Sequence, residues 1–357
     1  MSKQIKDNLV LTGGGTLGSV VPLLALADDL RDDFHLIFIG TKIGPEKDLL
    51  AIEGLPFLFV PAGKLRRYWS WQNFFTPFLF LAGLVKSFWL LKKIKPKAVI
   101  TAGSFVSVGV VAAAWLLRIP VLVHQLDYVP GLANKLMARL AKRITVSFKK
   151  STKDYSEATW TGLPIRQHLF DHIGAKAEAL KYFKLNNDRP VVLVLGGGTG
   201  ASRLNRLITD NLYNLTQVCQ LIHLTGTGKG LKIVGSSGYY QAAILDQSAI
   251  AKAYAAADLV VSRAGMGTLA ELAYLAKPAI IIPMPDSHQE ANAKVLAETQ
   301  AAIVLNQKKL NSPELYRQIK EVLADAKKLN SLGHNLQKTL KTDANEEIIK
   351  IIKELVK

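Results

Sequence analysis

The sequence has little cysteine and no uninterrupted apolar run long enough to span a membrane. Cys219 is the single cysteine among 357 residues. This excludes an internal disulfide and a zinc site built from several cysteines, and it fits a reducing compartment.

The apolar run at 74–85 is short and the run at 99–117 is interrupted by glycine and serine, whereas a helix needs ~20 apolar residues to cross a bilayer. The first residues lack the pattern of a cleaved leader, so we expect neither a transmembrane helix nor a signal peptide.

Acidic residues are also scarce. The chain has 28 Asp and Glu against 45 Lys and Arg, a formal net charge of +17, and residues 54–126 contain no acid at all. From Lys64 to Lys97 this window interleaves cations with aromatic rings. Such a segment favours a surface lying in the headgroup region of an anionic membrane. The alternatives are a core helix with a charged outer side, or nucleic-acid binding through base stacking; we expect the membrane surface and no nucleic acid.

Strand-like and helix-like segments alternate along the chain, and the pattern occurs twice. Apolar runs typical of buried strands fall at 9–12, 34–39, 57–60, 98–101, 121–124 and 144–146, and again at 190–195, 220–224, 242–244, 259–262, 279–282 and 302–304. This alternation predicts an α/β fold of two Rossmann-like parallel-sheet domains facing a cleft. We place them at 1–163 and 164–340, because glycine and proline punctuate the chain near Gly162. An amphipathic helix in 341–357 is expected to pack back on the first domain.

A glycine-rich turn follows the first strand of each half, at 13–18 and at 196–200. Glycines let the backbone approach a phosphate closely, and the helix that follows offers unpaired N–H groups and a positive dipole end. One such turn is equally consistent with a tight strand-to-helix connection. Two of them in tandem domains indicate an anionic ligand at the carboxyl ends of the strands.

Further glycines and polar residues follow the strands at 259–262 and 279–282. Gly265 and Gly267 make a turn, and we expect a helix to begin near Thr268. Glu271 then has two interpretations: it completes a capping box with Thr268, or its carboxylate accepts hydrogen bonds from a ribose diol. The segment 283–293 is rich in polar residues, and together the two segments predict the rim of one pocket.

These motifs resemble those of the MurG family, the UDP-N-acetylglucosamine transferases of peptidoglycan lipid-intermediate synthesis. The second half matches in LVLGGGTGASRLN, AYAAADLVVSRAGMGTLAELAYLAKPAIIIPMP and HQEANA, and the first half in TGGGTLGSVVPLLALA, the stretch from ITAGSF to RITVSF, and TGLPIR. The resemblance implies a GT-B fold and an inverting transfer of GlcNAc from UDP-GlcNAc to the C4 hydroxyl of undecaprenyl-diphosphate-linked MurNAc-peptide. It also implies peripheral docking on the cytoplasmic side of the cell membrane.

The resemblance also implies roles for individual residues. Glu271 would hold the ribose, Gln289 the sugar hydroxyls, and Arg166 the nucleotide or its phosphates. The full set expected to bind UDP-GlcNAc is Thr16, Leu17, Gly18, Asp127, Arg166, Gly198, Thr199, Gly200, Met266, Gly267, Thr268, Leu269, Glu271, Gln289 and Asn292. Helix dipoles and an arginine can stabilise the departing diphosphate, so we expect no metal and no cofactor.

The chain departs from the family pattern on the acceptor side. Leu17 stands where the first glycine motif usually has glycine, Ser19 where it has histidine, and the family's HEQN becomes the sequence from His124 to Asp127. A serine cannot take a proton near neutral pH unaided. The candidates for the catalytic site are therefore Asp127, His124 and Ser19, although His124 could be a hydrogen-bonded strand-end residue and Asp127 could cap the helix expected near Pro130.

Three functional alternatives stay open at this point. Asp127 or His124 serves as the base in the usual reaction; the acceptor is another lipid, such as diacylglycerol or a polyprenyl lipid; or the protein binds UDP-GlcNAc at the membrane without turnover.

Overall fold

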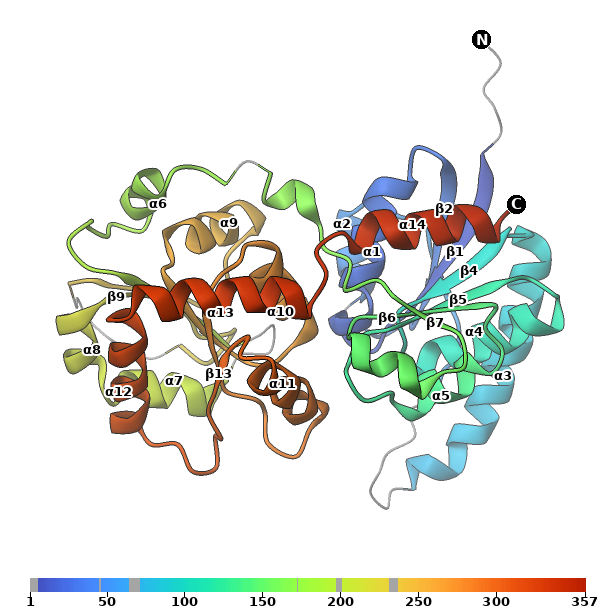
Figure 1. Ribbon diagram of the computed structural model, residues 1–357. Coiled ribbons are helices and arrows are strands. Elements are labelled where there is room, and N and C mark those ends of the chain that lie inside the picture. The colour runs from blue at the N-terminus through green and yellow to red at the C-terminus, as the bar shows by residue number, and fades with distance from the viewer. Residues whose placement is uncertain (1–5, 45, 64–70, 172, 197–200, 231–236) are drawn as a thin grey trace, which may run out of the picture. The chain divides into compact units, whose positions relative to one another are not determined.

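The structure, a computed structural model, describes residues 6–44, 46–63, 71–171, 173–196, 201–230 and 237–357. The chain divides into two compact units. Unit 1 comprises Met1–Arg166 and Lys341–Lys357, and unit 2 comprises Gln167–Leu340. Each unit is built around one parallel sheet covered by helices (Figure 1), which confirms the predicted α/β class.

Unit 1 contains a seven-stranded sheet in the order β3-β2-β1-β4-β5-β6-β7. Its strands are β1 (Asp7–Thr12), β2 (Phe34–Gly40), β3 (Phe57–Phe59), β4 (Ala98–Thr101), β5 (Val121–Gln125), β6 (Arg143–Val146) and β7 (Ala158–Trp160). Its helices are α1 (Val21–Leu30), α2 (Glu46–Ile52), α3 (Gln72–Ile94), α4 (Phe105–Leu116), α5 (Leu132–Ala138) and α14 (Ala344–Leu355), with short 3-10 turns η1 (Leu17–Ser19) and η2 (Lys149–Asp154). The last helix, α14, packs against α1.

Unit 2 contains a six-stranded sheet in the order β10-β9-β8-β11-β12-β13. Its strands are β8 (Val191–Leu195), β9 (Gln220–Leu224), β10 (Tyr239–Ala242), β11 (Leu259–Ser262), β12 (Ala279–Ile281) and β13 (Ile303–Val304). Its helices are α6 (Lys176–Tyr182), α7 (Ser202–Thr209), α8 (Leu212–Val218), α9 (Gln247–Ala256), α10 (Met266–Tyr274), α11 (His288–Glu298), α12 (Ser312–Leu323) and α13 (Ala326–Thr339), with a 3-10 turn η3 (Gln167–Leu169).

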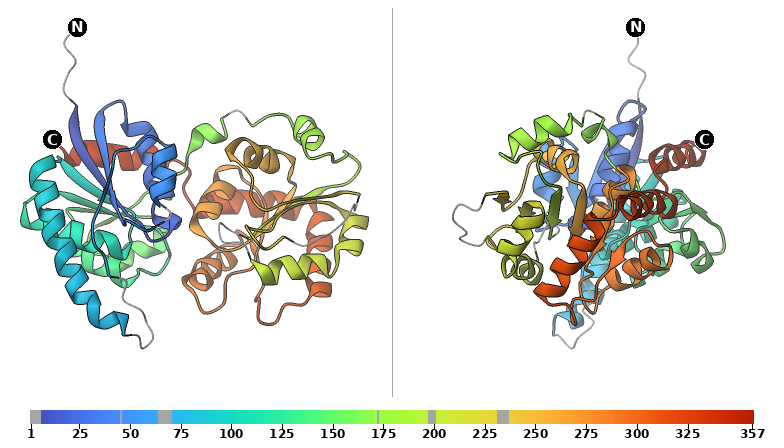
Figure 2. Two further views of the ribbon diagram at one scale, coloured as in Figure 1. Left: turned by 180° about the vertical axis from the view of Figure 1, so that it is seen from behind. Right: turned by 60° about the vertical axis from the view of Figure 1, so that its left-hand side comes forward.

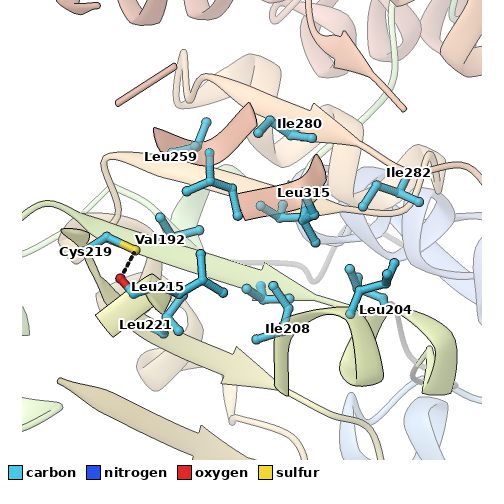
Figure 3. Packing of buried hydrophobic residues seen from close by; sticks show 14 of the residues in the cluster. Val192, Leu204, Ile208, Leu215, Cys219, Leu221, Leu259, Ile280, Ile282 and Leu315 are labelled. Atoms are coloured by element: carbon cyan, nitrogen blue, oxygen red, sulfur yellow. Dashed lines mark hydrogen bonds between the residues drawn. The ribbon is translucent and has the colours of Figure 1, made fainter. Parts of the chain in front are cut away.

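The central strands read as continuous apolar runs because helices cover both of their faces. In unit 2, the side chains of Val192, Leu221, Leu259 and Ile280 pack with those of the flanking helices in one buried cluster (Figure 3). Cys219 lies in this cluster, where its Sγ is 3.3 Å from the carbonyl oxygen of Leu215. Burial raises the pKa of the Cys219 thiol to about 12, so the single cysteine is an uncharged core residue.

One strand predicted from the sequence is wrong, and one strand of the structure was not predicted. The run at 242–244 is not a strand: β10 ends at Ala242 and pairs with β9 from Tyr239 onward, and Ile244 is exposed. The edge strand β7 was not predicted, because its three residues are half-buried or exposed and form no apolar run.

The strand orders locate the ligand-binding edge of each sheet. The order reverses between β1 and β4 in unit 1 and between β8 and β11 in unit 2. In open parallel sheets, ligands bind beyond the carboxyl ends of the strands at such a reversal. The loops after β1, β4 and β5, and those after β8, β11 and β12, are therefore the candidate site regions of their units.

Helix α3 has a mostly exposed apolar surface. Phe74, Phe78, Leu81 and Trp89 are each more than half exposed, and Pro77 lies inside the first turns. Figure 2 shows α3 on the outside of unit 1. None of the helices in the described ranges is both long enough and apolar enough to cross a membrane.

Candidate active site

The first part of the site in unit 2 is the N-terminus of α10. Gly265 is its N-cap, and no side chain caps this end. Among the described residues, no atom lies within 4 Å of a Cβ added at Gly265 or at Gly267, so both glycines at the start of the helix border open space. A helix end of this kind binds anions through its N–H groups and dipole.

Glu271 lies one turn further along α10. The helix begins at Met266 rather than near Thr268, so Thr268 is not the N-cap and the capping-box interpretation of Glu271 is wrong. Its Oε2 instead accepts a hydrogen bond of 2.6 Å from the hydroxyl of Tyr254 on α9. Burial raises the pKa of Glu271 to about 7, against the opposing effect of that hydrogen bond.

The remaining predicted residues of α10 divide by exposure. Gly267 is exposed and Thr268 is half-buried, whereas Met266 and Leu269 are buried. The backbone and the first residues of the turn can therefore face a ligand, while Leu269 anchors the helix to the core.

An arginine that the sequence reasoning missed joins the loops after β11 and β12. The guanidinium of Arg263 donates to the carbonyl oxygens of Ile282, at 2.9 Å, and Pro283, and also to Gln307 Oε1. These bonds fix the segment that leads into α11. In the sequence, Arg263 is visible only as a cation before a glycine turn, and this pattern does not predict which groups the cation contacts.

The two predicted residues on α11 differ in role. Asn292 is fully buried and donates to the carbonyl oxygen of Ala264 at 3.3 Å, so it supports the α10 turn from behind. The side-chain oxygen of Gln289 accepts from the backbone N–H of Met284 at 3.0 Å. Ser287 caps α11 through the N–H of Gln289. The predicted diphosphate residues Gly198, Thr199 and Gly200 lie outside the described residues.

In unit 1, a buried carboxylate holds the first glycine turn. Glu46 accepts from the N–H of Gly15 at 3.1 Å, and from the N–H and hydroxyl of Thr41 at 2.9 and 2.5 Å. Ser104 donates to the carbonyl oxygen of Gly14 at 2.7 Å. Gly14 has φ +140°, and a Cβ there would clash with Glu46. The Gly15 N–H is thus occupied by the protein's own carboxylate rather than offered to a phosphate.

The predicted residues that follow this turn have different environments. Thr16, Leu17 and Gly18 are exposed. Ser19 is buried, and its Oγ accepts from the N–H of Gly14 at 3.3 Å. Ser19 therefore closes the turn.

His124 does not fit the role of base. It is 1% exposed, and its Nδ1 and Nε2 lie 2.8 and 3.3 Å from the hydroxyls of Thr145 and Ser147. Burial lowers the pKa of His124 to about 3, so the ring is neutral and shielded from solvent. The structure corrects this assignment and favours the strand-end interpretation.

Asp127 follows β5 and is half-buried. Helix α5 begins at Leu132 with Gly131 as its N-cap and no side-chain cap, so Asp127 does not cap it. Gln125 shapes this loop: its Nε2 donates to the Asp127 carbonyl at 2.6 Å, and its Oε1 accepts from Asn134 at 2.6 Å. Side chains therefore hold this loop, which contains Asp127, at the carboxyl edge of the sheet.

Arg166 is engaged inside unit 1. Its guanidinium bonds to both oxygens of Glu53 at 2.6 and 2.9 Å and to Asp28 at 2.8 Å. A bidentate pair of this kind is strong and directional. The expectation that Arg166 reaches the nucleotide receives no support from this geometry, and we leave it out of the proposed donor site.

Two Rossmann-like units, each with one parallel sheet and a ligand edge, are the domains of the GT-B fold. Residues 9–146 match the glycosyltransferase family 28 N-terminal domain, and residues 191–348 match the family 28 C-terminal domain. The chain belongs to glycosyltransferase family 28 and, within it, to the MurG family.

Relatives and solved structures agree with this membership. The chain is 37% identical over 97% of its length to a UDP-N-acetylglucosamine–N-acetylmuramyl-(pentapeptide) pyrophosphoryl-undecaprenol N-acetylglucosamine transferase of Lachnospira eligens, covering 98% of that protein. It is 35% identical to the enzyme of the same name from Clostridium botulinum, over 98% of this chain and 99% of that one. The structure of MurG from Acinetobacter baumannii aligns with a TM-score of 0.77 at 25% identity, over 98% of this chain and 99% of that one.

Proposed function

We propose that the protein transfers N-acetylglucosamine from UDP-GlcNAc to the C4 hydroxyl of undecaprenyl-diphosphate-linked MurNAc-peptide. One observation of the structure carries the donor side: the open N-terminus of α10 has Glu271 one turn behind it. Hydrogen-bond donors for a diphosphate and an acceptor for a ribose diol thus follow each other on one helix. The relatives named above support this donor and this acceptor.

The donor contacts follow from that arrangement. The Glu271 carboxylate accepts from the ribose hydroxyls, the N–H groups at the start of α10 face the diphosphate, and the side-chain amide of Gln289 binds sugar hydroxyls. Negative charge grows on UDP as the bond between sugar C1 and phosphate oxygen breaks. Fixed backbone donors and a helix dipole stabilise charge that develops in this way.

The catalytic base that we propose is Asp127, which takes the proton of the attacking hydroxyl. The acceptor C4 oxygen attacks C1 on the face opposite UDP, a new C1–O bond forms with inversion, and the hydroxyl proton passes to the Asp127 carboxylate. His124 is buried and Ser19 bonds to the glycine turn, so neither competes for this role.

We also propose that α3 docks the protein peripherally on an anionic membrane, on the cytoplasmic side where the acceptor headgroup would lie. Its exposed rings Phe74, Phe78 and Trp89 share the helix with the exposed Lys92 and Lys93, and Lys92 Nζ is 5.3 Å from the Trp89 ring centroid. A helix surface that carries aromatic rings and lysines but no acidic residue suits the headgroup region of an anionic membrane.

Trp89→Ala should reduce binding to vesicles that contain phosphatidylglycerol, while Tyr213→Ala, which removes an exposed ring from unit 2, should not. Equal losses in both variants would contradict the assignment.

The reaction is tested by transfer of labelled GlcNAc from UDP-GlcNAc to a soluble lipid I analogue, with diacylglycerol as the second acceptor. We expect product on the lipid I analogue alone. Asp127→Ala should keep donor affinity and lose turnover, whereas Glu271→Ala should lose donor affinity. Product on diacylglycerol alone would assign another acceptor, and donor binding without any product would indicate a non-catalytic binder. An unchanged rate in Asp127→Ala would contradict the base assignment.

A further inference from the structure

A buried tyrosine that the proposed reaction does not use contacts the proposed ribose ligand. Tyr254 on α9 is among the largest fully buried side chains of the protein. Its hydroxyl lies 2.6 Å from Oε2 of Glu271 on α10. Both helices belong to unit 2, so the contact joins two elements of the same domain.

The direction of this hydrogen bond is fixed by the environment. Burial, with the adjacent Glu271 charge, raises the pKa of Tyr254 well above 10, so the phenol keeps its proton and donates it. The carboxylate accepts with Oε2. Within the described ranges, the side chain of Glu271 makes no other hydrogen bond, which leaves Oε1 with its full accepting capacity.

The tyrosine ring is itself held in place. Phe170 packs edge-on against Tyr254 with ring centroids 5.9 Å apart. The ring of Tyr274 on α10 contacts the same phenylalanine in a tilted arrangement, with centroids 6.2 Å apart. Close packing confines a buried ring to one rotamer. The hydroxyl is therefore a fixed point against which the Glu271 carboxylate is oriented.

We propose that Tyr254 is a positioning residue for the sugar-nucleotide donor: it holds Oε2 of Glu271 so that Oε1 presents its lone pairs to the ribose hydroxyls. This inference rests on the proposed function, because it takes Glu271 as the ribose ligand. Without the hydroxyl, the half-buried carboxylate loses its partner and is no longer held in the orientation that binds the diol.

Tyr254→Phe removes one oxygen atom and keeps the ring. The affinity for UDP should fall by about tenfold to hundredfold, the usual range for a hydrogen bond to a charged group. The affinity for 2′,3′-dideoxyuridine 5′-diphosphate should stay the same, because this ligand has no ribose hydroxyls for Glu271 to bind. Isothermal calorimetry of the full chain measures both. Tyr274→Phe deletes the same atom in the same aromatic cluster and should change neither affinity.

The Glu271→Gln variant separates failure of this inference from failure of the proposed function. If Glu271→Gln loses the preference for UDP over the dideoxy ligand while Tyr254→Phe keeps it, the ribose contact stands and the positioning role is overturned. If Glu271→Gln keeps the preference, the proposed donor site itself is wrong. Equal losses of both ligands in Tyr254→Phe would mean a structural role only, and so would a Tyr254→Phe chain that does not fold while Tyr274→Phe does; either result overturns the inference.

Discussion

At the scale of single residues, the ionisation of Glu271 should make donor binding depend on pH. Its pKa is raised to about 7, so the carboxylate is ionised above pH 7 and gains a proton as the pH falls through 7. Only the ionised form accepts from two ribose hydroxyls. The affinity for UDP-GlcNAc should therefore fall about tenfold from pH 8 to pH 6, as measured by calorimetry.

Glu271→Gln supplies the control for this pH dependence. The amide does not titrate, so its weaker binding should stay constant between pH 8 and pH 6. A wild-type affinity that is equally constant over this range would contradict the prediction.

The buried His124 should make the fold sensitive to acid. Its folded-state pKa is lowered to about 3 from 6.5, so below pH 6.5 the unfolded chain binds a proton that the native state does not. This contribution to stability is present above pH 6.5 and is lost as the pH falls toward 3, by about 1.4 kcal/mol per pH unit. The free energy of unfolding, measured in urea, should fall less steeply from pH 7 to pH 5 in His124→Gln than in the wild type. His35→Gln, at an exposed position, should follow the wild type, and parallel curves for all three proteins would refute the assignment.

Sequence reasoning can select residues with a recognisable local pattern, but it cannot see contacts that form between segments distant in the chain. Glu271 follows a glycine turn, and this pattern is visible in the sequence. The contacts of Tyr254, Arg263 and Glu46 depend on which helices and loops lie side by side, and no spacing along the chain encodes that. Both interpretations of His124 stayed open at the level of sequence, because a strand-end histidine shows neither its burial nor its two hydroxyl partners there.

At the scale of elements, the first glycine turn should depend on Glu46 of α2. Three donors meet its two oxygens. In Glu46→Gln, the remaining side-chain oxygen can still accept from Thr41. The amide NH₂ then lies against the N–H of Gly15, and because both groups are donors this hydrogen bond is lost. We expect a loss of about 1–3 kcal/mol in the free energy of unfolding and faster hydrogen exchange at the Gly15 amide.

Asp48→Asn, an exposed change on the same helix, is the matched control and should alter stability by less than about 0.5 kcal/mol. The donor affinity should be unchanged in both variants, because Glu46 belongs to unit 1. Unaltered Gly15 exchange in Glu46→Gln would show that the turn holds its conformation without the carboxylate.

The elements themselves were largely predictable, since buried parallel strands are short apolar runs and helices fill the intervals between them. The errors fall at the ends of elements. Residues 242–244 have the composition of a strand but follow the end of β10, and the helix after β11 starts at Met266, two residues before Thr268. Hydrophobic pattern cannot locate a boundary that depends on pairing register or on an uncapped helix end.

At the scale of the whole molecule, the chain returns to unit 1 after completing unit 2, and Asn345 secures this return. Asn345 lies at the start of α14 and is buried; its Oδ1 accepts from the N–H of Ile165 at 3.0 Å, and its Nδ2 donates to Asp29 Oδ2 of α1 at 2.7 Å. Asn345→Ala leaves the N–H of Ile165 and the Asp29 carboxylate without this partner. The free energy of unfolding of unit 1 should fall by about 1–3 kcal/mol.

Ligand-linked unfolding can assign that loss to unit 1. UDP binds the proposed site in unit 2 and should raise only the unfolding transition of that unit. In Asn345→Ala, the transition that UDP does not shift should move to lower denaturant, and the affinity for UDP should stay at the wild-type value. Asn335→Ala on α13, where an exposed amide donates to the carbonyl of Gln300, removes a surface contact of unit 2 and should leave the unit 1 transition in place. Destabilisation of the UDP-sensitive transition by Asn345→Ala would mean that the return of α14 supports unit 2 as well, against the division of the chain into two units.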